Sequence, residues 1–153
     1  MSGGVLVYAE ATDSKIHPVS FELLGKAREI AEKLGLSVWS VIIGFGVRQS
    51  ARELIYYGAD RVYVYDHESL KDFNVLAYKE ILVKLVRETN PEIFLIGATP
   101  LGRSLAPRVA AALDTGLTAD CTDLWVDEDG DLIQVRPAFT GNILAHIKTV
   151  SRP

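Results

Sequence analysis

Apolar residues along the chain fall into short continuous runs and into stretches with helical spacing. The short runs are rich in β-branched residues and predict four buried strands, at 5–9, 38–43, 62–65 and 93–96. After each run, apolar residues recur at steps of three and four, which predicts helices at 18–34, 50–57, 74–88 and 105–113. Gly35 and Gly58 stand where the first two helices should end. Four strand–helix repeats predict a parallel sheet covered by helices on both faces.

The pattern changes after Gly116. Three further strands are predicted at 120–126, 132–136 and 142–148, with no helix between them. The acidic segment 127–131 predicts the turn of an antiparallel hairpin. The expected fold class is therefore a three-layer, doubly wound α/β domain with a mostly parallel sheet. It is Rossmann-like and adenine-nucleotide-hydrolase-like, carries a C-terminal antiparallel β extension, and forms one domain over 1–153.

Composition narrows the classes of function. The 153 residues are 48% hydrophobic and 24% charged, which is typical of a soluble globular domain. The net charge of −4 argues against a nucleic-acid partner, which would favour a basic surface. The N-terminus lacks a basic leader, and no apolar run approaches the roughly 20 residues that span a bilayer. We therefore expect a cytoplasmic protein without membrane insertion.

The sequence predicts neither a catalytic constellation nor a metal site. None of the histidines (His17, His67 and His146) has a second histidine at metal-ligand spacing. Cys121 is the only cysteine and has no neighbouring base in the sequence to activate it, so a structural thiol is expected. Nucleophile-elbow, P-loop and zinc-peptidase motifs are missing from the sequence. The acidic turn lacks the longer ligand series of a calcium loop.

Two glycine-containing segments follow predicted strands. The first, 44–46, is best interpreted as a turn, because Gln49 stands where the dinucleotide fingerprint needs its last glycine. The second, 97–104, precedes a helix and could bind an anion through free backbone N–H groups and an arginine. Its candidate residues are Gly97, Thr99, Gly102, Arg103 and Ser104.

The alternative for this second segment is that the glycines only shape the loop while the arginine pairs with a neighbour. Because of Pro107, the sequence allows two starting points for the helix that follows 97–104. Either Ser104 caps the helix and Pro107 lies in its first turn, or the helix begins earlier and bends.

Three blocks, at 97–111, 113–124 and 136–145, together with the shorter segment 57–62, resemble alpha subunits of electron transfer flavoproteins. In the third block, Thr140 replaces the first of two glycines that members often have before the Asn. The resemblance implies the N-terminal scaffold domain of such a subunit. It implies a beta subunit as partner, and dehydrogenases and an electron acceptor as partners of the whole complex. FAD would be held mainly by a C-terminal domain that these residues do not include, and a fragment or an unusually short member is expected.

Candidate residues for the contact with the beta subunit lie in the third block: Arg136, Pro137, Phe139, Gly141 and Asn142. The main alternative function is an adenine-nucleotide-binding module of related fold, with phosphate cradled by 97–104. A hydrolase or transferase has the least support, because no acid–base constellation is evident.

Overall fold

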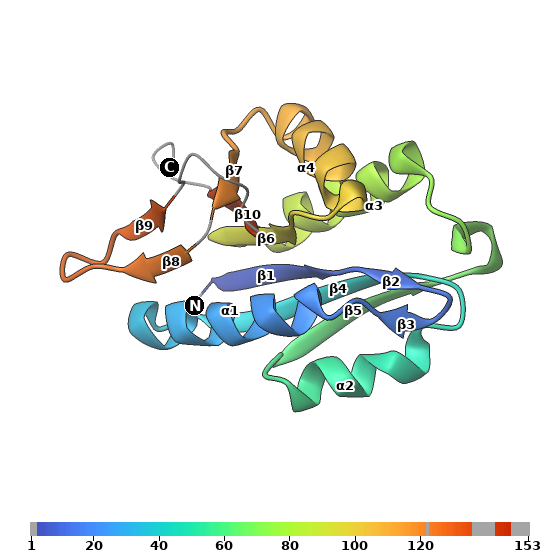
Figure 1. Cartoon of the computed structure of the whole chain (residues 1–153), viewed down its shortest axis with the longest axis horizontal. Helices are drawn as coiled ribbons and strands as arrows, with labels where there is room; N and C mark the ends of the chain where they lie inside the picture. Colours follow the sequence, from blue (N-terminus) through green and yellow to red (C-terminus); the bar gives the residue numbers. More distant parts are fainter. Residues whose placement is uncertain (1–2, 122, 136–142, 148–153) are drawn as a thin grey trace.

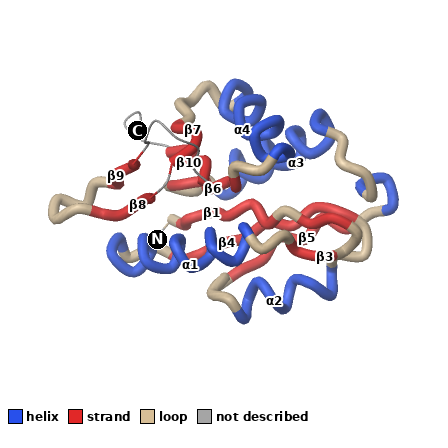
Figure 2. The backbone as a smooth tube through the Cα atoms, in the orientation of Figure 1, coloured by secondary structure: helices blue, strands red, loops and turns tan. Residues whose placement is uncertain are grey.

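The computed structural model describes residues 3–121, 123–135 and 143–147 (Figures 1 and 2). Its helices are α1 (Val19–Leu34), α2 (Ala51–Tyr56), α3 (Val75–Thr89) and α4 (Pro100–Ala112), with short 3-10 helices η1 (Arg48–Ser50) and η2 (Glu68–Leu70). Its strands are β1 (Gly4–Ala9), β2 (Ala11–Thr12), β3 (Lys15–Ile16), β4 (Ser37–Gly44), β5 (Arg61–Asp66), β6 (Ile93–Gly97), β7 (Thr118–Cys121), β8 (Asp123–Val126), β9 (Leu132–Val135) and β10 (Ile143–Ile147). None of the described helices is long and apolar enough to cross a membrane.

The main sheet has six strands in the order β5-β4-β1-β6-β10-β7. β5, β4, β1 and β6 are parallel, whereas β10 runs antiparallel to both of its neighbours. The chain winds outward from β1 to β5 and then crosses back to β6, so the switch point of the doubly wound sheet lies between β1 and β6. The predicted mostly parallel sheet with an antiparallel C-terminal extension is confirmed.

Helices cover both faces of this sheet (Figure 1). Side chains of β1 alternate between the two faces because successive residues of a strand point in opposite directions. Val5, Val7 and Ala9 pack in the core beneath α1 and α2, while Leu6 and Tyr8 pack beneath α3 and α4. All five are at least 98% buried, so β1 is the centre of the fold.

The ends of two helices follow from single residues. Gly35 adopts a left-handed conformation at φ 70°, and its N–H donates to the carbonyl of Ala31 at the end of α1. Asn74 caps α3, with its Oδ1 accepting the N–H groups of Leu76 and Ala77, each at 3.0 Å. Both boundaries agree with the prediction to within one residue.

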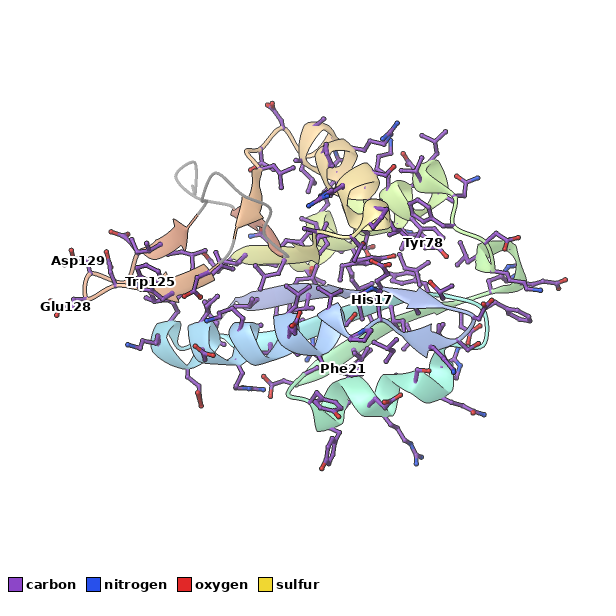
Figure 3. The ribbon with its side chains drawn as sticks, viewed as in Figure 1. His17, Phe21, Tyr78, Trp125, Glu128 and Asp129 are labelled. Carbon is purple, nitrogen blue, oxygen red and sulfur yellow. The ribbon has the colours of Figure 1, made fainter. Side chains whose placement is uncertain are left out.

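The segment predicted as one strand at 120–126 is two strands in different sheets. β7 pairs with β10 in the main sheet, whereas β8 pairs with β9 in a separate hairpin. The hairpin packs on α1, because Leu124 and Val126 are buried in the α1 core and Lys26 Nζ lies 3.1 Å from a carboxylate oxygen of Asp123. Trp125 and the acidic turn lie on the outside, where Figure 3 shows Trp125, Glu128 and Asp129 away from the sheet.

The start of α4 corrects the predicted helix at 105–113. The helix begins at Pro100, and the Thr99 hydroxyl caps it by accepting the N–H of Gly102 at 3.0 Å. Proline suits the first helical position because it has no N–H to satisfy there. Pro107 therefore lies inside the helix, and the second of the two alternatives, the earlier start, is right.

Candidate functional site

The carboxyl ends of β1 and β6 meet at the switch point, where ligands bind in open α/β sheets. Glu10 directly follows β1, and Thr99 lies two residues beyond β6. The Thr99 hydroxyl donates to Oε1 of Glu10 at 2.5 Å while it accepts the Gly102 N–H. Ser20 of α1 accepts the Glu10 N–H at 3.1 Å. We call Glu10, Ser20, Thr99 and Gly102 the switch-point cluster.

The backbone around Glu10 is held by the start of α1. The Glu10 carbonyl accepts the N–H of His17 at 2.8 Å, and His17 Nδ1 accepts the N–H of Val19 at 3.0 Å. His17 therefore has a structural role at the start of α1, where Figure 3 shows it. Glu10 is only 7% exposed, so the fold buries a carboxylate at the point where a doubly wound sheet binds ligands.

The switch-point cluster also affects a neighbouring tyrosine. Burial raises the pKa of Tyr8 well above its usual value, and the nearby phenol of Tyr78 and carboxylate of Glu10 raise it further. Tyr8 therefore stays neutral beside Glu10. A phosphate arriving at the start of α4 would meet the Glu10 carboxylate, and the Gly102 N–H there is already bonded to Thr99.

The five predicted anion-binding residues lie close together in the chain but differ in surroundings. A Cβ on Gly102 would lie 1.8 Å from the carbonyl oxygen of Gly97, and one on Gly97 would lie 2.9 Å from the methyl groups of Val19. Both glycines are therefore needed for close packing of α4 and α1 on β6. Arg103 is exposed and Ser104 half-buried in the first turns of α4, not in a loop. Anion binding by these residues stays a prediction.

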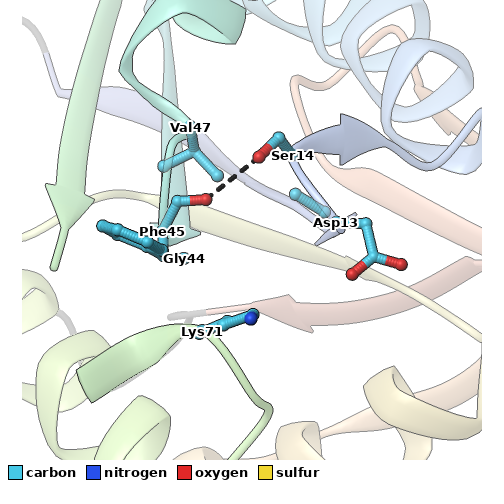
Figure 4. Close-up of a pocket in the computed structure, with 7 residues that line it drawn as sticks. Asp13, Ser14, Gly44, Phe45, Val47 and Lys71 are labelled. Atoms are coloured by element: carbon cyan, nitrogen blue, oxygen red, sulfur yellow. Dashed lines mark hydrogen bonds between the residues drawn. The ribbon is translucent and has the colours of Figure 1, made fainter. Parts of the chain in front are cut away.

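A pocket of about 250 Å³ opens at the same edge of the sheet, beyond the carboxyl end of β4 (Figure 4). It is lined by Ala11, Asp13, Ser14, Gly44, Phe45, Val47 and Lys71. The Ser14 hydroxyl donates to the Phe45 carbonyl at 3.1 Å, which ties the β2–β3 turn to the turn after β4. Asp13 and Lys71 give the pocket one charge of each sign, so it suits a small polar ligand better than a dianion.

The segment 44–46 is a turn, as predicted. The Asp66 carboxylate accepts the N–H groups of Gly46 and Arg48, each at 2.9 Å. These two hydrogen bonds hold the pKa of Asp66 below its usual value. The backbone donors that a dinucleotide phosphate would use are therefore taken by an internal carboxylate.

The remaining candidates from the sequence have local roles or cannot be placed. His67 Nδ1 accepts the N–H of Ser69 at the start of η2. Carboxylate oxygens of Asp127, Asp129 and Asp131 lie within 4.8 Å of one another, but Asp127 Oδ1 already accepts the N–H groups of the other two residues, as in a solvated turn. The side chains of Cys121 and His146, and the predicted contact residues Arg136, Pro137, Phe139, Gly141 and Asn142, lie outside the described part of the structure.

Sequence reasoning missed Glu10. Its signal was a single acidic residue between two alanines directly after a buried strand. That position faces the switch point only if β6 lies next to β1, and strand order is not visible in the sequence.

Comparison with known proteins identifies the family. A family model described as the electron transfer flavoprotein domain matches residues 5–153. The lactate dehydrogenase (NAD+, ferredoxin) subunit LctC of Acetobacterium woodii is 49% identical over 146 residues, covering 95% of this chain and 35% of that protein. The electron transfer flavoprotein subunit alpha of Clostridium acetobutylicum is 48% identical over 145 residues, covering 94% of this chain and 43% of that protein. Protein FixB of Clostridium saccharobutylicum is 45% identical over 145 residues, again covering 94% and 43%.

The chain spans between 35% and 43% of the length of these relatives. It belongs to the electron transfer flavoprotein family, where it matches the N-terminal part of the alpha subunits.

Proposed function

We propose that this chain is the scaffold domain of an electron transfer flavoprotein alpha subunit. In this proposal the complete heterodimer carries electrons on FAD from dehydrogenases to an acceptor, and this domain is a non-catalytic part that packs against the beta subunit. The observation that supports it most is the family match across residues 5–153, at an identity near 48% to named alpha subunits. The flavin would supply the redox chemistry, and the protein would supply its position.

The described residues do not fit FAD at either place where a doubly wound sheet would hold it. A dinucleotide pyrophosphate needs free N–H groups at a helix start without a competing negative charge. At α4 the Gly102 N–H is bonded to Thr99, and the Glu10 carboxylate is adjacent. After β4, Asp66 takes the donors of Gly46 and Arg48. We therefore assign the main FAD contacts to the rest of the alpha subunit and derive no electron-transfer step within this chain.

The contact with the beta subunit is proposed for the C-terminal β extension and the segment 136–142. Co-elution of the chain with the beta subunit, in the presence of FAD, tests this directly. We expect a stable complex, and we expect that Arg136→Glu weakens it while Arg108→Glu, an equal charge change on the exposed surface of α4, does not. Flavin absorbance of the chain alone completes the test. Tight stoichiometric FAD binding by the isolated chain, or failure to bind the beta subunit, would refute the proposal.

A second candidate is an adenine-nucleotide-binding module, which the position of the pocket beyond β4 supports although the pocket's mixed charge does not. The pocket lies at the carboxyl edge of the sheet, as a nucleotide site would. Its volume of about 250 Å³ lies below the roughly 300–1,000 Å³ of ordinary ligand pockets. This makes the nucleotide module the weaker candidate. Calorimetry with AMP and ATP decides between them, since no heat at millimolar nucleotide rules the module out.

A further inference from the structure

Two opposite charges line the pocket beyond β4 without pairing with each other. Asp13 lies in the β2–β3 turn, and Lys71 directly follows η2. Both side chains are exposed, and Figure 4 shows their charged ends directed toward the same gap from two separate segments. Among the residues that the structure describes, neither side chain makes an ion pair or a hydrogen bond. The two charges thus lie beyond ion-pair distance, which leaves room for a ligand between them.

Hydrogen bonds inside the protein hold the three segments that form the pocket. The Ser14 hydroxyl donates to the Phe45 carbonyl at 3.1 Å, and the Ser50 hydroxyl donates to the Ser14 carbonyl at 2.9 Å. The turn after β4 is fixed by the Asp66 carboxylate, and Lys71 closes η2 through its backbone N–H. None of these contacts uses either charged group. The pocket is therefore formed before a ligand arrives, and both charges are available to it.

The charges and the size of the pocket select a class of ligand. A phosphate would be repelled by Asp13, and a simple cation would be repelled by Lys71. A molecule that carries one ammonium and one carboxylate group matches both charges at once. The volume of about 250 Å³ is below the roughly 300–1,000 Å³ of ordinary ligand pockets and restricts the occupant to a small molecule. Phe45, which is 47% exposed, offers an apolar wall to a short aliphatic side chain.

We propose that this pocket binds a small zwitterion, namely a free α-amino acid with a short side chain. The ligand carboxylate contacts the Lys71 ammonium, and the ligand ammonium contacts the Asp13 carboxylate. Because both protein charges are exposed and screened by salt, we expect a dissociation constant of about 1 mM. The inference does not rest on the scaffold role, since the pocket residues belong to none of the segments proposed for contact with the beta subunit.

Amide NMR spectra of the 153-residue chain, titrated with glycine and alanine at low salt, test the proposal. We expect shifts that saturate at the amides of 13–14, 44–47 and 71, and a dissociation constant that rises with added sodium chloride. Acetate and methylammonium each carry one of the two charges. At the same ionic strength, each should bind at least about tenfold more weakly than glycine.

Two variants remove one charge each with little effect on the fold. Asp13 has a left-handed backbone conformation at φ 50°, which asparagine also tolerates, and the Lys71 side chain has no polar contact to lose in the described structure. Asp13→Asn and Lys71→Gln should each raise the dissociation constant for glycine by at least about tenfold. Asp114→Asn is the matched control for the first, because Asp114 is exposed and has φ 53°. Lys84→Gln, at an exposed position of α3, is the control for the second.

Three outcomes would overturn the proposal. Amides around the pocket that do not shift with alanine at about 100 mM would show that no zwitterion binds. Acetate that binds as tightly as glycine would leave an anion site only. Shifts caused by AMP but not by alanine would assign the pocket to the nucleotide module. Co-elution with the beta subunit is measured separately, so failure of the scaffold role and failure of this site are distinguishable.

Discussion

The Thr99 hydroxyl donates a hydrogen bond to the Glu10 carboxylate and accepts one from the Gly102 N–H. One side chain thereby joins the end of β1, the end of β6 and the start of α4. Glu10 and Thr99 are 89 positions apart in the sequence, so the contact forms only when the two halves of the sheet have met. At the switch point, where doubly wound sheets bind ligands, this chain therefore has a hydrogen bond between two of its own side chains.

Thr99→Val should destabilise the chain by about 2 to 4 kcal/mol, because it removes a helix cap and leaves a buried carboxylate without its donor. The shape of the side chain is nearly unchanged, so lost packing contributes little. The free energy of unfolding in urea measures the effect. Thr99→Ser keeps the hydroxyl and should cost about 1 kcal/mol or less. Thr12→Val, the same change at an exposed strand position, should stay within about 0.5 kcal/mol of the parent chain.

Gly102→Ala should cost at least about 3 kcal/mol, because the new methyl group would overlap the backbone of β6 and α4 would have to move. Gly25→Ala is the matched control. Gly25 lies on the exposed side of α1, and nothing approaches within 4 Å of an added Cβ. There the change should stabilise the chain by about 0.5 to 1 kcal/mol, since alanine is the better helix former. Thermal and urea unfolding of both variants distinguish the two effects, and equal effects would contradict this account of α4.

The attachment of the β8–β9 hairpin should depend on one face of β8. Leu124→Ala should cost about 2 to 4 kcal/mol, because Leu124 is fully buried against α1. Trp125→Ala removes a larger side chain from the exposed face and should cost less than about 1 kcal/mol. Trp125→Ala removes one of the two tryptophans, so fluorescence would differ between the variants for that reason alone. The unfolding of both variants is therefore followed by circular dichroism. A larger loss for Trp125→Ala would show that the hairpin faces the other way.

Asp60 should contribute to acid sensitivity. Partial burial opposes its ionisation, but the hydrogen bond from the Val38 N–H at 2.8 Å and the Arg28 guanidinium at 3.1 Å outweigh this and hold its pKa below the usual value. Since the folded-state pKa lies below the unfolded one, the stabilisation is complete above about pH 4 and is lost as the pH falls through the folded-state pKa.

Exposure of the Arg28–Asp60 pair keeps this stabilisation below about 1 kcal/mol. Carbon-detected NMR titration of the carboxyl groups measures the pKa of Asp60 itself. Arg28→Gln should raise the pKa of Asp60 while the Val38 hydrogen bond remains. A pKa that does not move would mean that the ion pair contributes nothing.

Local signals in the sequence predicted most of the fold. Apolar runs and helical spacing were sufficient for the four parallel strands and for α1, α2 and α3, and Gly35 marked the end of α1. The start of α4 was missed because glycine at 102 suggested a loop, although Thr99-Pro100 is a typical cap followed by a first helical residue. The break between β7 and β8 was missed because each has a strand-like pattern, and the sheet that each joins depends on distant partners.

The sequence predicted an anion site where a helix follows β6, with Thr99 among its residues, and that site stays a prediction. The Glu10 side chain lies at this carboxyl edge of the sheet. It is buried because β1 and β6 are neighbouring strands. Adjacency of strands is a property of the folded chain and leaves no local pattern at either residue.

The placement of β10 between β6 and β7 has a consequence for synthesis of the protein. On a ribosome, β7 emerges more than twenty residues before β10, yet β10 is the one strand that pairs with β7 among the described residues. The first four parallel strands can assemble while translation continues, whereas β6 keeps an open edge until β10 arrives. The nascent chain is therefore exposed to mispairing at β6 during this interval, and a chaperone that protects it would act there.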